Sequence, residues 1–160
     1  MQNETQVSGA NRYEGLIGDD RVHSSLYTNE EVFEDEMLTI FRNGWVFICH
    51  ESEISGPGDF VRRNVGRDPV FAIRARDGEI SVIENRCAHR GNIICQEDSG
   101  SAKALVCQYH GWAYDTKGAL IDVPYPAGFQ GDFSCHGLER LPKVDRMCLR
   151  YWIIWVDRRY

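Results

Sequence analysis

Two segments decide how the 160-residue sequence is interpreted: residues 85–100, NRCAHRGNIICQEDSG, and residues 107–124, CQYHGWAYDTKGALIDVP. The first contains Cys-x-His at 87–89, and the second contains Cys-x-x-His at 107–110. Each motif offers one thiol and one imidazole among small and turn-forming residues. Thiolates suit iron–sulfur clusters and zinc, and imidazoles suit both metals. The pattern therefore predicts two loops that converge on one metal site with two sulfur and two nitrogen ligands.

These segments resemble the cluster-binding segments of Rieske [2Fe–2S] domains, in which two histidines replace two cysteines on one iron. The resemblance implies that Cys87 and Cys107 hold the inner iron, and that His89 and His110 hold the outer, solvent-facing iron. Neutral imidazoles carry less negative charge than thiolates, so such a cluster is reduced more easily than an all-cysteine cluster. The implied fold is mainly β: a Rieske-type antiparallel β sandwich with a cluster-binding subdomain, preceded by an N-terminal helix.

A structural zinc site is the main alternative for the same four side chains, because tetrahedral zinc accepts two thiolates and two imidazoles. Zinc fingers, however, pair Cys with Cys and His with His at short spacings, whereas each motif here pairs one Cys with one His. Lone core cysteines and histidines are common, but four of them at this spacing are not. The sequence favours the Rieske cluster over a zinc-stabilised interaction module.

Three positions beside the candidate ligands bear on the redox potential. Rieske domains of respiratory and photosynthetic complexes carry an extra cysteine in each loop, and the pair forms a disulfide over the cluster. By resemblance, Asn92 and Tyr109 occupy these positions, and Trp112 replaces a serine that hydrogen-bonds the cluster. A cluster without that hydroxyl donor has a less stable reduced state. We therefore predict a midpoint potential near the low end of the roughly −150 to +300 mV range of Rieske centres.

A third segment, residues 27–60, YTNEEVFEDEMLTIFRNGWVFICHESEISGPGDF, resembles the part that precedes the Rieske domain in bacterial aromatic-ring-hydroxylating dioxygenase α subunits. The similarity extends over residues 25–127 and returns at Tyr151–Asp157. It implies that electrons pass from a ferredoxin or an NAD(P)H-dependent reductase to a mononuclear Fe(II), which hydroxylates an aromatic compound with O₂. It also implies a homotrimer of α subunits, with or without β subunits. A stand-alone Rieske-type ferredoxin is the alternative, although it has no need of a leading helix.

The mononuclear iron site of that family requires two histidines and one carboxylate. Beyond the candidate ligands, the sequence offers only His23, His50 and His136, which are isolated from one another. We therefore assign no catalytic residue, and we expect the chain to be the N-terminal part of a longer polypeptide that carries the catalytic domain. The expected division is a polar arm over 1–24, a leading helix over 25–44 and a Rieske domain over 45–160.

Local patterns place the secondary structure. Thr28 and Glu31 form a capping-box pattern before apolar residues at helical spacing, which predicts a helix over 29–42. The dipeptide Asp77-Gly78 is favoured in two-residue hairpin turns. The run over 148–156 is apolar on both faces and is expected to form one buried strand. The other predicted strands cover residues 45–49, 70–76, 79–84, 104–107 and 112–114.

Composition and charge exclude several classes of protein. The chain is 42% hydrophobic and 26% charged, as in ordinary globular proteins, and its net charge of −6 disfavours nucleic-acid binding. No apolar run is long enough to cross a membrane, and no signal peptide is visible, so we expect a cytoplasmic protein. The charge is polarised: residues 1–59 carry a net −9 and residues 60–160 a net +3. The simpler interpretation is an acidic solvated helix face and a mildly basic domain. The alternative is that the basic part attracts an acidic partner.

The remaining cysteines are expected to be bystanders. Cys49 and Cys148 lie in apolar runs and are predicted to be buried core thiols. Cys95 and Cys135 lie nearer turns and are predicted to be partly exposed.

Several side chains that border the candidate ligands are candidates for a docking surface. Tyr109 and Trp112 flank a candidate ligand and are expected to shield the cluster or to contact a partner. The basic residues that border the motifs and are candidate contacts for an acidic redox partner are Arg86, Arg90, Lys103 and Lys117.

Overall fold

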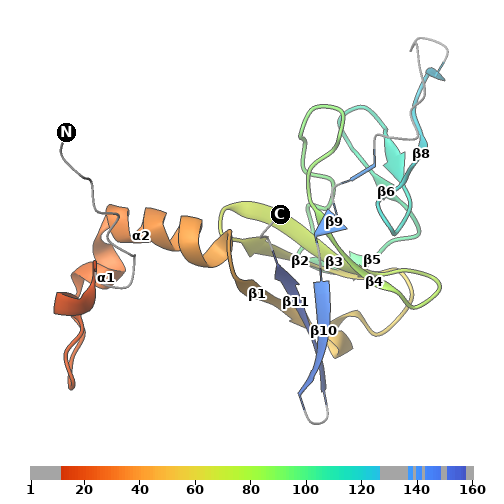
Figure 1. Ribbon diagram of the computed structural model, residues 1–160. Helices are drawn as coiled ribbons and strands as arrows, with labels where there is room; N and C mark the ends of the chain where they lie inside the picture. Colours follow the sequence, from red (N-terminus) through yellow and green to blue (C-terminus); the bar gives the residue numbers. More distant parts are fainter. Residues whose placement is uncertain (1–11, 127–136, 139, 142, 149–150, 158–160) are drawn as a thin grey trace, which may run out of the picture.

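A computed structural model describes residues 12–126, 137–138, 140–141, 143–148 and 151–157. They form three antiparallel sheets preceded by a helical arm (Figure 1). The predicted fold class, mainly β with antiparallel strands, is confirmed. Cys135 and His136, about which the sequence made predictions, lie outside the described residues.

The helical arm projects away from the β body (Figure 1). Its elements are η2 (Glu14–Leu16), α1 (Ser25–Thr28), α2 (Glu30–Glu36) and the π-helical η3 (Met37–Phe41). Residues 12–24, which the sequence predicted only as part of a polar arm, contain η2 and a β-bridge between Ile17 and Val22.

The cap of α2 differs from the predicted one. The side chain of Asn29 accepts hydrogen bonds from the backbone N–H groups of Glu31 (2.7 Å) and Val32 (3.4 Å), so Asn29 is the N-cap and Thr28 is not. Asparagine is among the preferred N-cap residues because its oxygen satisfies backbone donors that the first turn leaves free. Thr28 instead ends α1, where its hydroxyl donates to the carbonyl oxygen of Ser24.

Two larger sheets form the base of the β body. One has the order β1-β11-β10, and the other has the order β5-β2-β3-β4-β9. The single strand predicted over 148–156 is wrong: Cys148 pairs with Tyr151 across an antiparallel hairpin, so the chain reverses between two strands. The bounds are β1 (Trp45–His50), β2 (Asp59–Val65), β3 (Asp68–Arg74), β4 (Ile80–Glu84), β5 (Ser99–Ser101), β9 (Arg140–Leu141), β10 (Lys143–Cys148) and β11 (Tyr151–Asp157), with a 3-10 turn η4 (Glu51–Ile54) after β1.

A small third sheet carries the cluster-binding subdomain. Its order is β6-β7-β8, and its strands are β6 (Leu105–Val106), β7 (Ala113–Tyr114) and β8 (Leu120–Asp122). In Figure 1 this sheet and the two motif-bearing loops stand together at one end of the β body, away from the helical arm.

The central strand β3 joins two hydrophobic cores because successive side chains of a strand point to opposite faces. Val70 and Ala72 belong to the core that also contains Ile48 of β1. Phe71 and Ile73 belong to the core beneath the cluster-binding subdomain. The five-stranded sheet is thus covered on both faces, and it gives the motif-bearing loops a rigid, dry floor.

The β3–β4 hairpin has a three-residue loop, which corrects the predicted two-residue turn. The backbone N–H of Ala75 donates to Glu79 O at 2.7 Å, and that of Gly78 donates to Ala75 O at 3.0 Å. Gly78 has a φ of +88°, as expected where a type I turn is followed by a left-handed residue.

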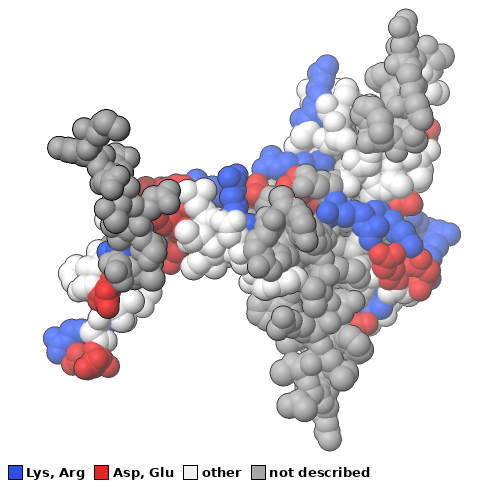
Figure 2. All heavy atoms as spheres, in the orientation of Figure 1, with Lys and Arg blue, Asp and Glu red and all other residues white. Residues whose placement is uncertain are grey.

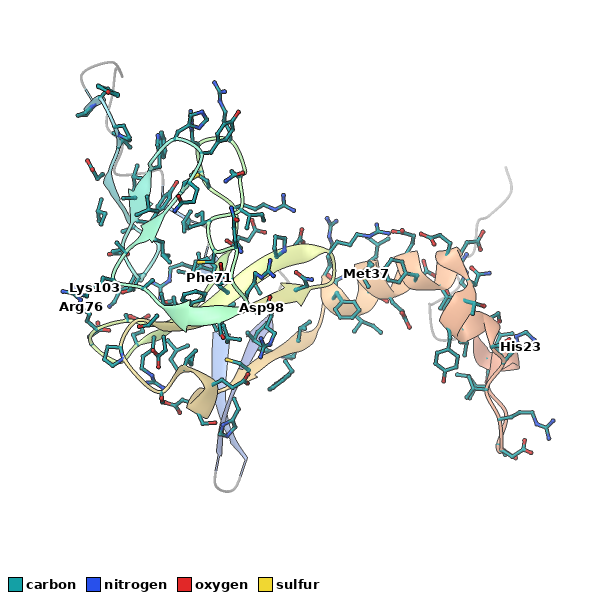
Figure 3. The ribbon with its side chains drawn as sticks, turned by 180° about the vertical axis from the view of Figure 1, so that it is seen from behind. His23, Met37, Phe71, Arg76, Asp98 and Lys103 are labelled. Carbon is teal, nitrogen blue, oxygen red and sulfur yellow. The ribbon has the colours of Figure 1, made fainter. Side chains whose placement is uncertain are left out.

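The arm is attached to the sheet where the β2–β3 turn meets η3. Gly66, with a φ of +61°, lies so close that a Cβ there would be 3.1 Å from Sδ of Met37 and 3.2 Å from Cβ of Phe41. Beside it, the guanidinium of Arg67 pairs with Glu34 and lies over the ring of Phe33 at 5.1 Å. Figure 3 shows Met37 at this junction and His23 at the far end of the arm.

Acidic side chains gather along the arm, as the charge pattern predicted (Figure 2). Among the described residues, no helix is long and apolar enough to cross a membrane.

Candidate functional site

The two motif-bearing loops share one backbone design. In the first loop the N–H of Cys87 donates to Asn92 O at 2.8 Å, and the N–H of Gly91 donates to Cys87 O at 2.8 Å. The second loop repeats both bonds at 2.9 Å, with Cys107 in the place of Cys87 and residues 111–112 in the place of 91–92. Each loop is therefore a six-residue turn that begins at a cysteine.

Glycine is required at the fifth position of each turn. Gly91 has a φ of +68° and Gly111 a φ of +73°, a left-handed conformation that costs other residues roughly 1–2 kcal/mol. At Gly111 a side chain would also meet Cγ of Pro124 at 2.9 Å. The repeated Cys…Gly spacing in the sequence is thus explained by the shared turn.

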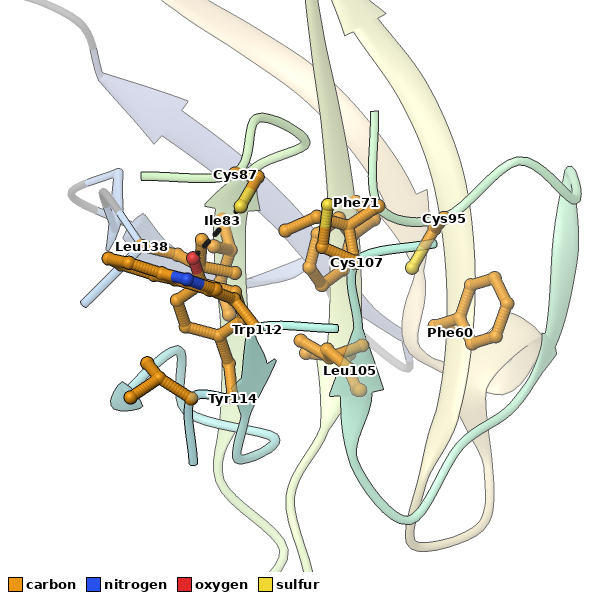
Figure 4. Packing of buried hydrophobic residues seen from close by; sticks show 13 residues of the cluster. Phe60, Phe71, Ile83, Cys87, Cys95, Leu105, Cys107, Trp112, Tyr114 and Leu138 are labelled. Atoms are coloured by element: carbon orange, nitrogen blue, oxygen red, sulfur yellow. Dashed lines mark hydrogen bonds between the residues drawn. The ribbon is translucent and has the colours of Figure 1, made fainter. Parts of the chain in front are cut away.

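The structure brings the four predicted ligands together as two pairs of different exposure. Cys87 and Cys107 are buried in the core beneath the subdomain, and their side chains interact. Figure 4 shows both thiols at one edge of this core. The imidazoles of His89 and His110 are only half-buried. The thiols thus form the inner end of the site and the imidazoles the outer end.

The two imidazoles turn the same nitrogen toward each other. Nδ1 of His89 lies 3.1 Å from Nδ1 of His110, and the ring centroids are 4.6 Å apart with planes at 72°. Two nitrogens bound to one tetrahedral metal at about 2.0–2.1 Å lie roughly 3.3 Å apart, so the spacing fits a shared metal ion. Partial burial, the neighbouring His110 and Arg90 lower the pKa of His89, which favours the neutral imidazole that binds metals.

Cys107 has an environment that stabilises a thiolate. Burial alone would raise its pKa, but hydrogen bonds from the backbone N–H groups of Tyr109 and His110, together with those from the side chains of Cys87 and Asn92, outweigh burial and lower it. Such bonds favour the charged form of an acceptor. The turn that begins at Cys107 thus directs its own amides at the sulfur.

Tyr114 is a site residue that our sequence analysis did not identify. Its hydroxyl lies 3.2 Å from Sγ of Cys87 and accepts a hydrogen bond from the N–H of Ala88 at 3.2 Å. The residue is fully buried, and burial, followed by its contact with Cys87, raises the pKa of the phenol. A signal was available: Trp112 and Tyr114 alternate along a short strand, so both point to the same face.

Asn85 is a second residue that we missed, and it closes the base of the first loop. Its side-chain oxygen accepts from the N–H groups of Ile94 (3.0 Å) and Cys95 (2.9 Å), and its amide donates to Cys95 O (2.7 Å). Asn85 is fully buried. Nothing in the sequence marks it except its place two residues before Cys87.

Two aromatic side chains flank the imidazoles. The indole of Trp112 stacks on His89, with centroids 4.9 Å apart and an interplanar angle of 7°. Tyr109 lies beside His110 at 3.8 Å, and 61% of its surface is exposed. Trp112 is thus buried against His89, whereas Tyr109 is exposed.

The bystander thiols differ from the candidate ligands. Burial raises the pKa of Cys49 to about 12 and that of Cys95 to about 11. Cys95 is buried, so its predicted partial exposure is wrong: the bonds from Asn85 hold its backbone against the core. The burial predicted for Cys49 is confirmed, and the side chain of Cys148 lies outside the described part of the chain.

Two of the four basic candidates have acidic partners within the chain. Lys117 pairs with Asp77 at 2.5 Å and with Glu79 at 2.9 Å, and Arg86 lies 3.7 Å from Asp68. Arg90 and Lys103 are exposed.

Two of the three isolated histidines, His23 and His50, lie within the described residues, and each contacts a serine two positions further along the chain. The ring nitrogen Nδ1 of His23 lies 2.8 Å from Oγ of Ser25, and that of His50 lies 2.7 Å from Oγ of Ser52.

Comparison with known proteins identifies the class of this domain. The family model of the Rieske [2Fe–2S] domain matches residues 44–142. The chain therefore belongs to the Rieske [2Fe–2S] domain family.

Its sequence relatives include oxygenase subunits. It is 45% identical over 115 residues to the benzene 1,2-dioxygenase subunit alpha of Pseudomonas putida, a match that covers 72% of this chain and 25% of the relative. It is 46% identical over 105 residues to the biphenyl 2,3-dioxygenase subunit alpha of Rhodococcus jostii, a match that covers 66% of this chain and 23% of the relative. The chain thus spans about a quarter of the length of the curated relatives it matches.

Solved structures of oxygenases also superimpose on this chain. The naphthalene 1,2-dioxygenase of a Rhodococcus species bound to indole superimposes with a TM-score of 0.77 and 33% identity, over 86% of this chain and 31% of the other. A quaternary ammonium Rieske monooxygenase superimposes with a TM-score of 0.75 and 26% identity, over 84% of this chain and 36% of the other.

Proposed function

We propose that this chain holds a Rieske [2Fe–2S] cluster and transfers single electrons as the Rieske part of an aromatic-ring-hydroxylating dioxygenase α subunit. Cys87 and Cys107 would hold the inner iron, and His89 and His110 the outer iron. The observation that carries this proposal is the approach of the two Nδ1 atoms to 3.1 Å, in the same two turns that hold two buried thiols in contact with each other.

The grouping of the ligands supports a cluster of two irons over a single zinc ion. A tetrahedral zinc site needs four side chains around one point. Within the described residues, no three His, Cys, Asp or Glu side chains are arranged to hold one ion. The four candidate ligands form instead one thiol pair and one imidazole pair, which is the ligand set of a Rieske centre.

The chain's own residues prepare the site for electron transfer. When bound, the cluster supplies a one-electron redox couple. The backbone amides of Tyr109 and His110 and the hydroxyl of Tyr114 stabilise negative charge on the sulfur ligands. The buried floor around Cys107 excludes water, while the half-buried histidines leave an edge of the site near the surface.

The relatives support the place of this domain in a larger enzyme, since the named relatives are oxygenase subunits. Electrons would arrive from a ferredoxin or an NAD(P)H-dependent reductase and leave for a mononuclear Fe(II) in the catalytic domain. A homotrimer of α subunits, with or without β subunits, would bring the two metal sites together. A donor would approach the exposed side of the imidazoles, where Tyr109 and Arg90 are accessible.

The ligand assignment is tested by iron and acid-labile sulfide analysis together with electron paramagnetic resonance of the dithionite-reduced protein. We expect two irons and two sulfides per chain and a spectrum with the low average g value of a Rieske centre. His89→Ala and His110→Ala should abolish that spectrum, whereas His23→Ala, at the far end of the arm, should preserve it. Bound zinc, or the spectrum of an all-cysteine cluster, would refute the assignment.

The donor surface is tested by stopped-flow reduction of the protein with its reductase and ferredoxin. Arg90→Glu should slow reduction at low salt, and the difference from wild type should shrink as salt screens the charge. Arg76→Glu, an exposed charge change in the β3–β4 loop, is the control. Equal effects of the two variants would contradict this surface.

A further inference from the structure

The sixth residue of each motif-bearing turn places its side chain against the opposite turn. Trp112 closes the second turn, yet its indole stacks on His89 of the first turn. Asn92 closes the first turn, and its amide lies 3.8 Å from Sγ of Cys107 in the second. Each turn therefore carries two of the proposed ligands and contacts a ligand of the other.

The contact between Trp112 and His89 is well defined. The rings are nearly parallel at 7°, and Trp112 is only 4% exposed. The backbone oxygen of Trp112 accepts a hydrogen bond from the N–H of Cys107 at 2.9 Å. This bond closes the second turn and fixes the backbone from which the indole extends. A buried aromatic ring of this kind has one well-packed orientation, and it transmits that orientation to the ring stacked on it.

The imidazole of His89 is less buried than the indole of Trp112. This imidazole is half-buried at the outer end of the site, and its ring contacts come from the second turn: Trp112 on one face and His110 at 72°. The torsion of a histidine ring about its Cβ–Cγ bond is broad when nothing restricts it. If the ring rotated, Nδ1 would no longer face Nδ1 of His110.

We propose that Trp112 is a positioning residue for His89: its indole fixes the imidazole plane so that Nδ1 of His89 faces Nδ1 of His110. This inference rests on the proposed function, because it assigns to Trp112 the orientation of a ligand of the outer iron. It also gives a role to Trp112, which occupies the position of the serine in the Rieske domains of respiratory and photosynthetic complexes. In this chain the residue at that position orients a ligand and does not supply a hydroxyl group.

A purely structural role for Trp112 is the competing explanation, since it is also a member of the core beneath the subdomain. Two substitutions separate the explanations. Trp112→Phe keeps an aromatic ring that can stack on His89, and Trp112→Met keeps apolar volume without a ring. Phe71→Leu is the matched control, because Phe71 is fully buried in the same core and lies in the central sheet (Figures 3 and 4).

The measurements are the electron paramagnetic resonance spectrum of the reduced protein, the rate of iron release to a ferrous chelator, and the thermal unfolding midpoint. We expect Trp112→Met to shift or broaden the g values and to release iron at least threefold faster than wild type. Trp112→Phe should keep the wild-type spectrum. Phe71→Leu should lower the unfolding midpoint and leave the spectrum unchanged.

The inference is overturned if Trp112→Met retains the wild-type spectrum and iron-release rate, or if Trp112→Phe and Trp112→Met behave alike. If Trp112→Met does not accumulate, Trp112→Leu, which also lacks a ring, takes its place. It should release iron faster than both Trp112→Phe and Phe71→Leu, and equal rates overturn the inference. A wild-type protein without a Rieske spectrum would instead refute the proposed function, before any variant is compared.

Discussion

The phenolic oxygen of Tyr114 lies 3.2 Å from Sγ of Cys87, although 26 residues separate the two in the chain. Because Tyr114 is fully buried, this contact is not exchanged with water. A hydroxyl directed at a sulfur ligand stabilises the more negative, reduced form of a cluster. Tyr114 therefore partly offsets the absence of a serine at Trp112, while the predicted potential remains near the low end of the Rieske range.

Tyr114→Phe should lower the midpoint potential by roughly 40 mV. A hydrogen bond contributes about 1 kcal/mol, and about 59 mV corresponds to a tenfold change for one electron. Protein-film voltammetry measures the shift. Tyr109→Phe removes an exposed hydroxyl from the neighbouring loop and should change the potential much less. A wild-type midpoint well above zero would contradict the low-potential assignment.

Asn85→Ala should lower the free energy of unfolding by about 3 kcal/mol, because it leaves three buried backbone groups of Ile94 and Cys95 without their partner. Since these bonds close the base of the first loop, the iron content per chain should fall as well. Urea denaturation and iron analysis measure both effects. Asn64→Ala, at an exposed position of β2, is the control and should change neither quantity. Full iron content in Asn85→Ala would show that the loop does not depend on this clamp.

Gly66→Ala should destabilise the protein more than Gly78→Ala. Both glycines have positive φ, which costs alanine roughly 1–2 kcal/mol. A side chain at Gly78 meets nothing within 4 Å, whereas one at Gly66 crowds Met37 and Phe41 and adds about 1 kcal/mol or more. Thermal and urea unfolding of the two variants give the difference directly. Equal losses would mean that the junction between η3 and the β2–β3 turn adapts freely.

Lys117→Met should make the protein less sensitive to acid. A hydrogen bond from Lys117, followed by a backbone hydrogen bond, lowers the pKa of Asp77. Hydrogen bonds from Lys117 and then from Arg140 lower the pKa of Glu79. Their stabilisation is therefore present above their ordinary values of 3.8 and 4.5, and it is lost as pH falls through the lower folded values.

Urea unfolding at several pH values between 6 and 3 measures this effect. Wild type should lose more stability over that interval than Lys117→Met, and Lys103→Met, which changes an exposed lysine, should follow wild type. Parallel curves for wild type and Lys117→Met would rule out a contribution from the pairs with Asp77 and Glu79.

Much of the fold could be predicted because its signals are local. The apolar run of β1 and the hairpin of β3 and β4 follow from hydrophobic patterns and one Asp-Gly pair. The strand β2 was missed because Arg62, Arg63 and Asn64 interrupt its apolar pattern, and pairing with β3 along its whole length determines it instead. The strands β10 and β11 were merged because nothing in the apolar pattern marks the reversal between them.

The sequence by itself indicated the ligand set that we propose for the candidate site, and it predicted the family. Each motif places one thiol and one imidazole within a single turn, so residue type and spacing along the chain suffice to indicate the ligand set. Only the tertiary structure decided what surrounds those ligands. Tyr114 reaches Cys87, Trp112 stacks on His89 and Asn85 holds Cys95 because separate strands and turns pack over one hydrophobic core. Such contacts depend on how the sheets and turns pack in space, and no periodicity along the chain specifies them.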